Sequence, residues 1–367
     1  MTSYDQFIAS KIKNPMPLGF EPTMDLNAKL FEWQKLIVTW AIRQGRAALF
    51  EDCGLGKTAQ QIEWARQVSL HTWKPVLILC PLVVADQTCR EAEKFGFAPI
   101  KHVRQPEEIN LNTAGVCITN YEKLDLFREI IPQLGGIVLD ESSILKSFTG
   151  KTRHDLTDSF KQTPYRLCCT ATPAPNDFTE LGQHAEFLGI CSSTEMLATW
   201  FINDTANTGT WRLKKHASDD FWKWVASWAA CVSKPSDLGF DDSDFKLPPL
   251  ELIPVWVEVD EADTSGGELF RIASMSAAHV NQEMRLTKVD RCKAATDIAK
   301  ATEDASIIWC NLNDEADELL LSLDDCVEVR GCDRPEHKET KLRKFTNGEV
   351  KRKIGRASCR ERVSSPV

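Results

Sequence analysis

Residues 48–59 read ALFEDCGLGKTA and hold the strongest single signal in the chain. An apolar run ends at Phe50, and a glycine-rich motif follows at Gly54, Leu55, Gly56, Lys57 and Thr58. A strand, such a turn and a helix bring backbone N–H groups to a phosphate, with the lysine at the β- and γ-phosphates and the threonine hydroxyl on Mg²⁺. The stretch predicts an ATP–Mg²⁺ site, although Glu51 stands where a general phosphate-binding loop has its first glycine. The alternative is a glycine-rich turn with a chance Lys-Thr.

Short apolar runs alternate with longer amphipathic ones from Leu30 to about Cys191. The apolar runs are AALF, PVLILC, GVCIT, GGIVLD and YRLCCT, and apart from Arg166 in the last of them they are free of charge until their C-terminal ends. Such runs are typical of strands buried on both faces, and their alternation with helices predicts an α/β fold with a parallel sheet. Functional residues are then expected at the C-terminal ends of the strands.

Polar residues do follow two further runs. GGIVLDESS ends a strand in Asp140 and Glu141, where one acid can hold Mg²⁺ through water and the second can polarise the attacking water. CCTATPAPND places Thr170 and Thr172 after the next strand, where hydroxyls can bond to the acidic pair. The alternatives are two solvated acids at the N-terminus of a helix and a turn of small residues.

Together these motifs resemble a superfamily 2 helicase of the Swi/Snf type, with a DEAD-like core, over nearly all of residues 30–353. In that family an acidic pair and one more residue precede Gly-Leu-Gly-Lys-Thr, as Glu51, Asp52 and Cys53 do here. The resemblance therefore implies that the loop binds nucleotide despite the missing glycine. The residues of these motifs are most similar to those of the compact helicases of bacteriophages.

The resemblance also implies roles for further segments. LFEWQ is similar to the adenine-reading segment, which makes Gln34 the expected adenine contact. ITNYEKL is similar to a segment that lies near nucleic-acid phosphates, here through Thr119 and Tyr121. The implied site comprises catalytic Lys57, Asp140 and Glu141; nucleotide contacts Gln34, Gly54, Leu55, Gly56, Lys57 and Thr58; Mg²⁺ ligands Thr58 and Asp140; and nucleic-acid or coupling residues Thr119, Tyr121, Lys146, Thr170 and Thr172.

The sequence departs from the family at two places. Ser147 replaces the asparagine of a Leu-Lys-Asn motif, and Ser142-Ser143 stand where Ala/Gly-His is usual. That histidine links hydrolysis to the nucleic-acid site in the family, so coupling is expected to run differently here. Lys146, Lys151 and Arg153 form a small basic group, which suits either a phosphate-backbone contact or a solvated face.

The expected organisation has five segments. They are an N-terminal extension (1–29), a first RecA-like ATP-binding lobe (30–190), a helical Trp-rich insertion and connector (191–253), an incomplete second RecA-like lobe (254–353) and a tail (354–367).

The tail has a foreign appearance. Residues 354–363 read IGRASCRERV, which resembles the translation of a common sequencing-library adapter over ten consecutive residues. The alternative is a natural basic tail. On the adapter interpretation the chain is C-terminally truncated before the second-lobe arginine that the resemblance implies, and it is expected to hydrolyse ATP weakly.

Composition limits the alternatives. The formal charge of −9 excludes a broadly basic nucleic-acid coat, so any nucleic-acid contact must come from a local patch. The 13 cysteines show no metal-type spacing and indicate reduced thiols in a cytoplasm, that of a bacterial host if the gene is phage-encoded. We expect no membrane segment and no metal other than Mg²⁺.

The resemblance implies an ATP-dependent helicase or translocase that couples hydrolysis to movement on DNA, with double-stranded DNA favoured. Three alternatives stay open: an RNA helicase, a motor subunit working beside a nuclease or methylase in a restriction or modification system, and a non-hydrolysing module that binds nucleotide and DNA. The sequence indicates no oligomeric state.

Overall fold

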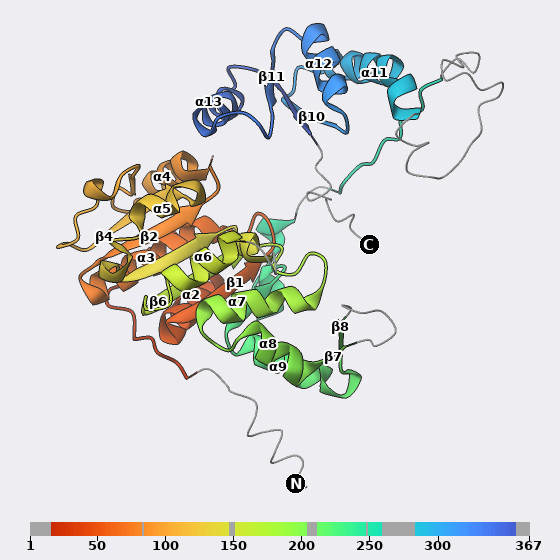
Figure 1. Ribbon diagram of the computed structural model, residues 1–367. Coiled ribbons are helices and arrows are strands. Elements are labelled where there is room, and N and C mark those ends of the chain that lie inside the picture. Colours follow the sequence, from red (N-terminus) through yellow and green to blue (C-terminus); the bar gives the residue numbers. More distant parts are fainter. Residues whose placement is uncertain are drawn as a thin grey trace. The chain divides into compact units, whose positions relative to one another are not determined.

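The computed structural model describes residues 16–82, 84–146, 151–203, 211–246, 249–258 and 283–356. The chain forms two compact units, Met1–Leu247 and Pro248–Val367 (Figure 1). Among the described residues, no helix combines the length and apolar character needed to cross a membrane.

The first unit is built on a seven-stranded sheet in which every pair of neighbouring strands is parallel. The strand order is β3-β4-β2-β5-β6-β1-β9. The strands are β1 (Arg46–Glu51), β2 (Pro75–Cys80), β3 (Lys101–His102), β4 (Gly115–Asn120), β5 (Gly136–Asp140), β6 (Tyr165–Thr170) and β9 (Ala229–Val232). The predicted parallel α/β fold is confirmed, and the five apolar runs correspond to β1, β2, β4, β5 and β6.

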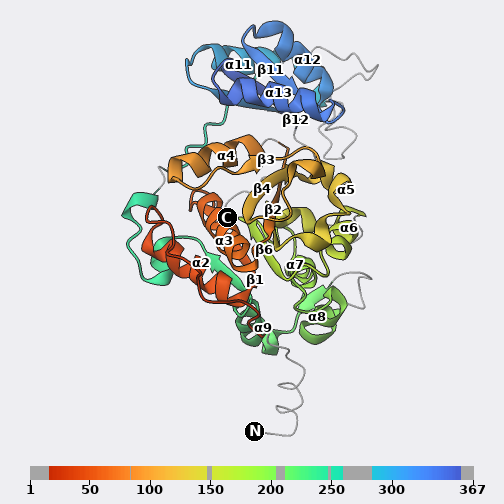
Figure 2. The same ribbon diagram turned by 90° about the vertical axis from the view of Figure 1, so that its left-hand side faces the viewer.

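Helices pack on both faces of this sheet (Figures 1 and 2). One face carries α2 (Glu32–Gln44), α3 (Lys57–Thr72) and α4 (Val84–Phe95). The other carries α5 (Leu124–Phe127), α6 (Lys151–Ser159), α7 (Leu181–Leu188), α8 (Ser193–Trp200) and α9 (Ser218–Ala226).

The two faces have separate hydrophobic cores. In β2, Val76, Ile78 and Cys80 belong to one core, while Leu77 and Leu79 belong to the other. Successive side chains of a strand point to opposite faces, so a strand covered on both sides must be apolar throughout. This explains the uninterrupted apolar runs.

The strands that carry the motifs lie side by side in the order β5-β6-β1. In register, Asp140 of β5 pairs with Cys169 of β6, and Phe50 of β1 pairs with Thr170. The carboxyl ends of the three strands therefore meet at one edge of the sheet.

The Trp-rich region contributes to the first unit. Its strand β9 pairs with β1, and Trp228, just before β9, is fully buried. A two-stranded antiparallel sheet of β7 (Phe201–Asn203) and β8 (Trp211–Leu213) lies in the same region. Residues 191–253 thus include the edge strand next to the phosphate-loop strand.

The second unit has a three-stranded parallel sheet in the order β10-β12-β11. Its elements are α11 (Lys288–Lys300), β10 (Ser306–Cys310), α12 (Asn313–Ser322), β11 (Cys326–Val329), α13 (Pro335–Thr346) and β12 (Arg352–Arg356). Ile354, the first residue of the adapter-like segment, is fully buried in β12. Residues 357–367 of the expected tail lie outside the described residues.

Candidate nucleotide site at the carboxyl edge of the first sheet

The phosphate-loop motif joins β1 to α3. Gly54 and Gly56 have φ of 85° and 76°, in the left-handed region that favours glycine. A Cβ on Gly56 would also lie 2.6 Å from the Nε2 atom of Gln34. Backbone conformation therefore requires glycine at position 56, whereas a Cβ there would have to displace the end of the Gln34 side chain.

The ammonium group of Lys57 lies within the loop. Its Nζ donates to the backbone oxygen of Glu51 at 2.7 Å and to that of Asp52 at 2.8 Å. Thr58 is half-buried on the first turn of α3. The loop's own carbonyls thus hold the cation at the N-terminus of a helix, where an anion is favoured.

Gln34 connects α2 to the loop. It is 3% exposed; its Nε2 donates to the Leu55 oxygen at 2.9 Å, and its Oε1 accepts from the Phe31 N–H at 3.0 Å. Both ends of the amide are therefore engaged within the protein. Each end of the amide keeps one further hydrogen-bonding position, a lone pair on Oε1 and a second N–H on Nε2. An adenine contact by Gln34 remains a prediction.

The acidic pair ends β5. Asp140 is buried, which raises its pKa to about 6, and the negative charge of Glu141 adds to the effect. Glu141 is exposed and has φ of 51°, an arrangement that costs a side chain about 1–3 kcal/mol. Thr170 donates from Oγ1 to Glu141 Oε2 at 3.2 Å and accepts from the Thr172 N–H at 3.1 Å. The two expected threonines and Glu141 thus form one network.

The other expected nucleic-acid residues are less accessible. The Tyr121 hydroxyl donates to the Asp140 backbone oxygen at 2.7 Å, and burial raises its pKa well above the usual value. Thr119 is fully buried on β4. Lys146 is half-buried at the end of the turn after the acidic pair, whereas the side chains of residues 151–153 lie outside the description. Tyr121 therefore supports Asp140 from within the protein.

Sequence reasoning missed two buried contacts near these motifs. The Gln60 Nε2 donates to Glu51 Oε2 at 2.7 Å, and burial raises the Glu51 pKa to about 7. The Ser142 Oγ lies 3.1 Å from Nε2 of His184, and both residues are fully buried. The first contact joins residues nine positions apart across the loop, and the second joins residues 42 positions apart, so no local pattern indicates either.

Magnesium fits the described donors only together with a phosphate. Among the described residues, no group of three or more His, Cys, Asp or Glu side chains is arranged to hold a metal ion. The Thr58 hydroxyl and the Asp140 carboxylate are oxygen donors of the kind that Mg²⁺ uses alongside phosphates and water.

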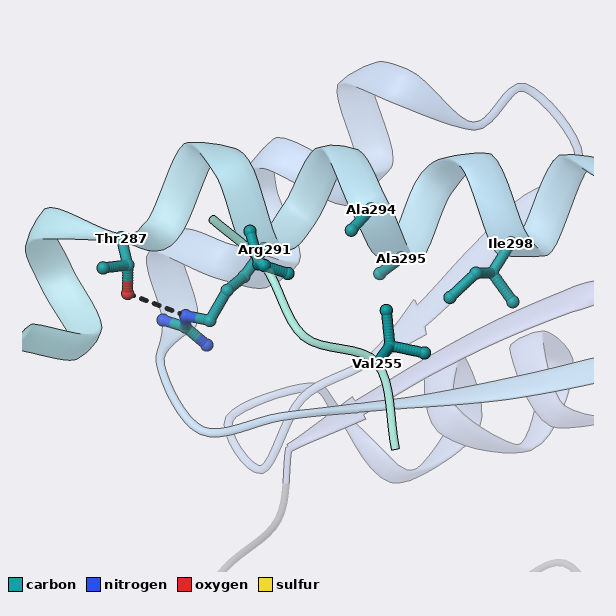
Figure 3. A pocket seen from close by; sticks show the side chains of 7 residues that line it. Val255, Thr287, Arg291, Ala294, Ala295 and Ile298 are labelled. Carbon is teal, nitrogen blue, oxygen red and sulfur yellow. Dashed lines mark hydrogen bonds between the residues drawn. The ribbon is translucent and has the colours of Figure 1, made fainter. Parts of the chain in front are cut away.

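Two pockets lie apart from these residues. A pocket of about 370 Å³ in the second unit lies between Val255 and α11 (Figure 3). Arg291 lines this pocket. Its guanidinium donates a hydrogen bond to the Thr287 hydroxyl at 3.0 Å and forms an ion pair with Glu315 at 2.6 Å. A pocket of about 240 Å³ in the first unit lies between α3 and the start of β4. Neither is lined by a residue of the expected site.

Comparison with known proteins places these motifs in a family. The model of the SNF2-related domain matches residues 33–223. Helicase domino of Drosophila melanogaster is 30% identical over 200 residues, covering 48% of this chain and 6% of that protein. The DNA annealing helicase and endonuclease ZRANB3 of Bos taurus is 30% identical over 200 residues, covering 50% of this chain and 18% of that protein.

A Caenorhabditis elegans homolog of SWI/SNF-related matrix-associated actin-dependent regulator of chromatin subfamily A-like protein 1 is 31% identical over 179 residues. That match covers 45% of this chain and 25% of the relative, so the chain spans a quarter or less of each of these three proteins. Among solved structures, the Sulfolobus solfataricus SWI2/SNF2 ATPase core in complex with dsDNA aligns with a TM-score of 0.48 and 17% identity, covering 92% of this chain and 80% of that one. Because the SNF2-related domain covers more than half of the sequence, the chain belongs to the SNF2-related family.

Proposed function

We propose that this chain is an ATP-dependent motor that moves on double-stranded DNA. The observation that carries the proposal is the meeting of Lys57, Asp140, Glu141 and Thr170 at one edge of the sheet. Family membership supports ATP as the nucleotide that is hydrolysed, and the relative named as a DNA annealing helicase supports DNA as the nucleic acid that is bound.

Each residue of the edge has a proposed role. Lys57 exchanges the carbonyls of Glu51 and Asp52 for the β- and γ-phosphates, which the N-terminus of α3 also attracts. Thr58 and Asp140 would hold Mg²⁺, which neutralises phosphate charge when it is bound. Glu141 orients and polarises the attacking water, and Thr170 holds the Glu141 carboxylate.

The test is ATP hydrolysis measured alone and with duplex DNA, single-stranded DNA or RNA. We expect duplex DNA to stimulate most, and E141Q and K57A to lower the rate by about 100-fold or more, since each removes a group at the reacting phosphate. The matched controls are E107Q, at an exposed position, and K101A, whose ammonium also donates to a backbone carbonyl. Both should keep the wild-type rate.

Other outcomes would replace the proposal. Stronger stimulation by RNA would favour an RNA helicase. Nucleotide binding without hydrolysis by the wild type would favour a binding module. Displacement of a third strand from a DNA triplex then distinguishes movement along DNA from hydrolysis alone.

A further inference from the structure

Glu141 has an unusual backbone conformation for its place in the fold. Among the described residues, only Trp73 and Glu141 are non-glycine residues with positive φ, at 54° and 51°. Trp73 is an exposed residue that ends α3, where a left-handed conformation is common. Glu141 instead follows a buried strand at the proposed catalytic edge, so its surroundings must hold this conformation.

Contacts hold Glu141 from two sides. On one side its carboxylate accepts from Thr170 at 3.2 Å. On the other, the backbone oxygen of Glu141 accepts from the Ile144 N–H at 3.2 Å, and the next residue, Ser142, contacts His184 at 3.1 Å. His184, which makes this contact with Ser142, lies on α7.

His184 is itself fixed in place. Its ring meets Phe50 edge-on, with centroids 5.1 Å apart and an interplanar angle of 82°. Phe50 is the residue before Glu51 on β1, so His184 contacts the strand that leads into the phosphate loop as well as the turn after the acidic pair. Burial lowers the His184 pKa to about 4, so the imidazole is neutral near pH 7 and has one donor and one acceptor.

We propose that His184 is a positioning residue for Glu141. Its bond to Ser142 fixes the turn after the acidic pair, and this keeps Glu141 in the left-handed conformation that directs its carboxylate to Thr170. The histidine comes from α7, 42 positions along the chain from the residue that it contacts. The catalytic part of this inference rests on the proposed ATPase function.

The test compares H184A, S142A, the double variant and H184Q with the wild type. H184Q keeps a donor and an acceptor. H102A is the matched control. His102, on β3, is also largely buried, and its ring nitrogen contacts the carboxylate of Asp86, on α4, at 2.8 Å. The measurements are single-turnover ATP hydrolysis with protein in excess, affinity for a fluorescent ATP analogue, and hydrogen exchange of residues 140–146.

We expect H184A and S142A each to slow single-turnover hydrolysis by about 10-fold or more, since small misplacements of a catalytic group have effects of this size. Affinity should stay within about twofold, and exchange in residues 140–146 should rise. The double variant should lose no more than either single one, because both remove the same bond. H184Q should recover most of the rate, and H102A should match the wild type.

Three outcomes would each overturn the inference. H184A could hydrolyse ATP at the wild-type rate, the losses of rate could multiply in the double variant, or the variants could lose affinity as much as rate. If the wild type does not hydrolyse ATP, the proposed function fails, and hydrogen exchange alone decides whether His184 positions the turn. If H184A does not fold, S142A and H184Q decide in the same way.

Discussion

Glu51 stands where a general phosphate loop has glycine, and its carboxyl is fully buried. Gln60 binds one of its oxygens, while the other has no hydrogen-bond partner among the described residues. Burial raises the Glu51 pKa from 4.5 to about 7. The folded state therefore binds this proton more tightly than the unfolded state, and the group's contribution to stability falls as pH rises from about 4.5 to about 7.

Replacing this acid by its neutral isostere should stabilise the protein at high pH. We expect E51Q to raise the free energy of unfolding by up to about 3 kcal/mol at pH 8, and by little near pH 4.5. Urea unfolding at the two pH values measures the difference. E107Q is the exposed control, and a gain that does not depend on pH would contradict the explanation.

Gly56 and Gly54 allow strain and crowding to be separated. Both have positive φ, but a Cβ at Gly54 meets nothing within 4 Å, whereas one at Gly56 meets Gln34 at 2.6 Å. We expect G54A to cost about 1 kcal/mol from strain, and G56A to cost more and to weaken nucleotide binding as well. Thermal unfolding and binding of a fluorescent ATP analogue test this pair. Equal effects of the two changes would show that the Gln34 side chain moves aside at no measurable cost.

At the scale of elements, the sequence predicts those features that depend on local pattern. Strands buried on both faces need continuous apolar runs, so β1, β2, β4, β5 and β6 could be predicted. The edge strand β3 could not, because its two residues, Lys101 and His102, are polar. The edge strand β9 could not, because its four apolar residues continue the apolar stretch that begins in α9 and show no boundary. Likewise the loop and the acidic pair follow strands directly, whereas the Ser142–His184 bond joins residues that only the folded chain brings together.

The packing of β9 depends on one large side chain. Trp228 is fully buried, contacts Phe50 and Trp224 with ring centroids 6.0 and 5.4 Å away, and its backbone oxygen accepts from the Ala48 N–H at 2.9 Å. We expect W228A to lower the free energy of unfolding by about 3–5 kcal/mol, because it leaves a large cavity beside β1. Urea unfolding measures the loss. W222A, at a position 39% exposed, should cost clearly less than W228A, and similar losses would contradict the assignment.

At the scale of the whole molecule, the chain consists of two units of unequal core size. The first has two extensive cores, whereas the described core of the second comprises Cys292, Ala299, Cys310, Ala316, Leu319, Leu323 and Ile354. Ile307 and Trp309 of β10 are about half exposed. The first unit is therefore expected to be much the more stable on its own.

A fragment of residues 1–247 should fold and bind nucleotide. All the residues proposed to contact ATP and Mg²⁺ lie in this unit, so we expect an affinity for a fluorescent ATP analogue within about tenfold of that of the full chain. Circular dichroism establishes folding, and fluorescence titration measures binding. A folded fragment without measurable affinity would show that the second unit contributes essential contacts.

The register of β5, β6 and β1 has an evolutionary consequence. Neighbouring strands lie about 4.8 Å apart, so the backbone ladder, and not the connecting segments, sets the spacing between the acidic pair, Thr170 and the phosphate loop. Segments that enter the sheet at its opposite edge can then lengthen, shorten or diverge without altering that spacing. Such a scaffold would let relatives exchange large insertions while retaining the same arrangement of reactive groups.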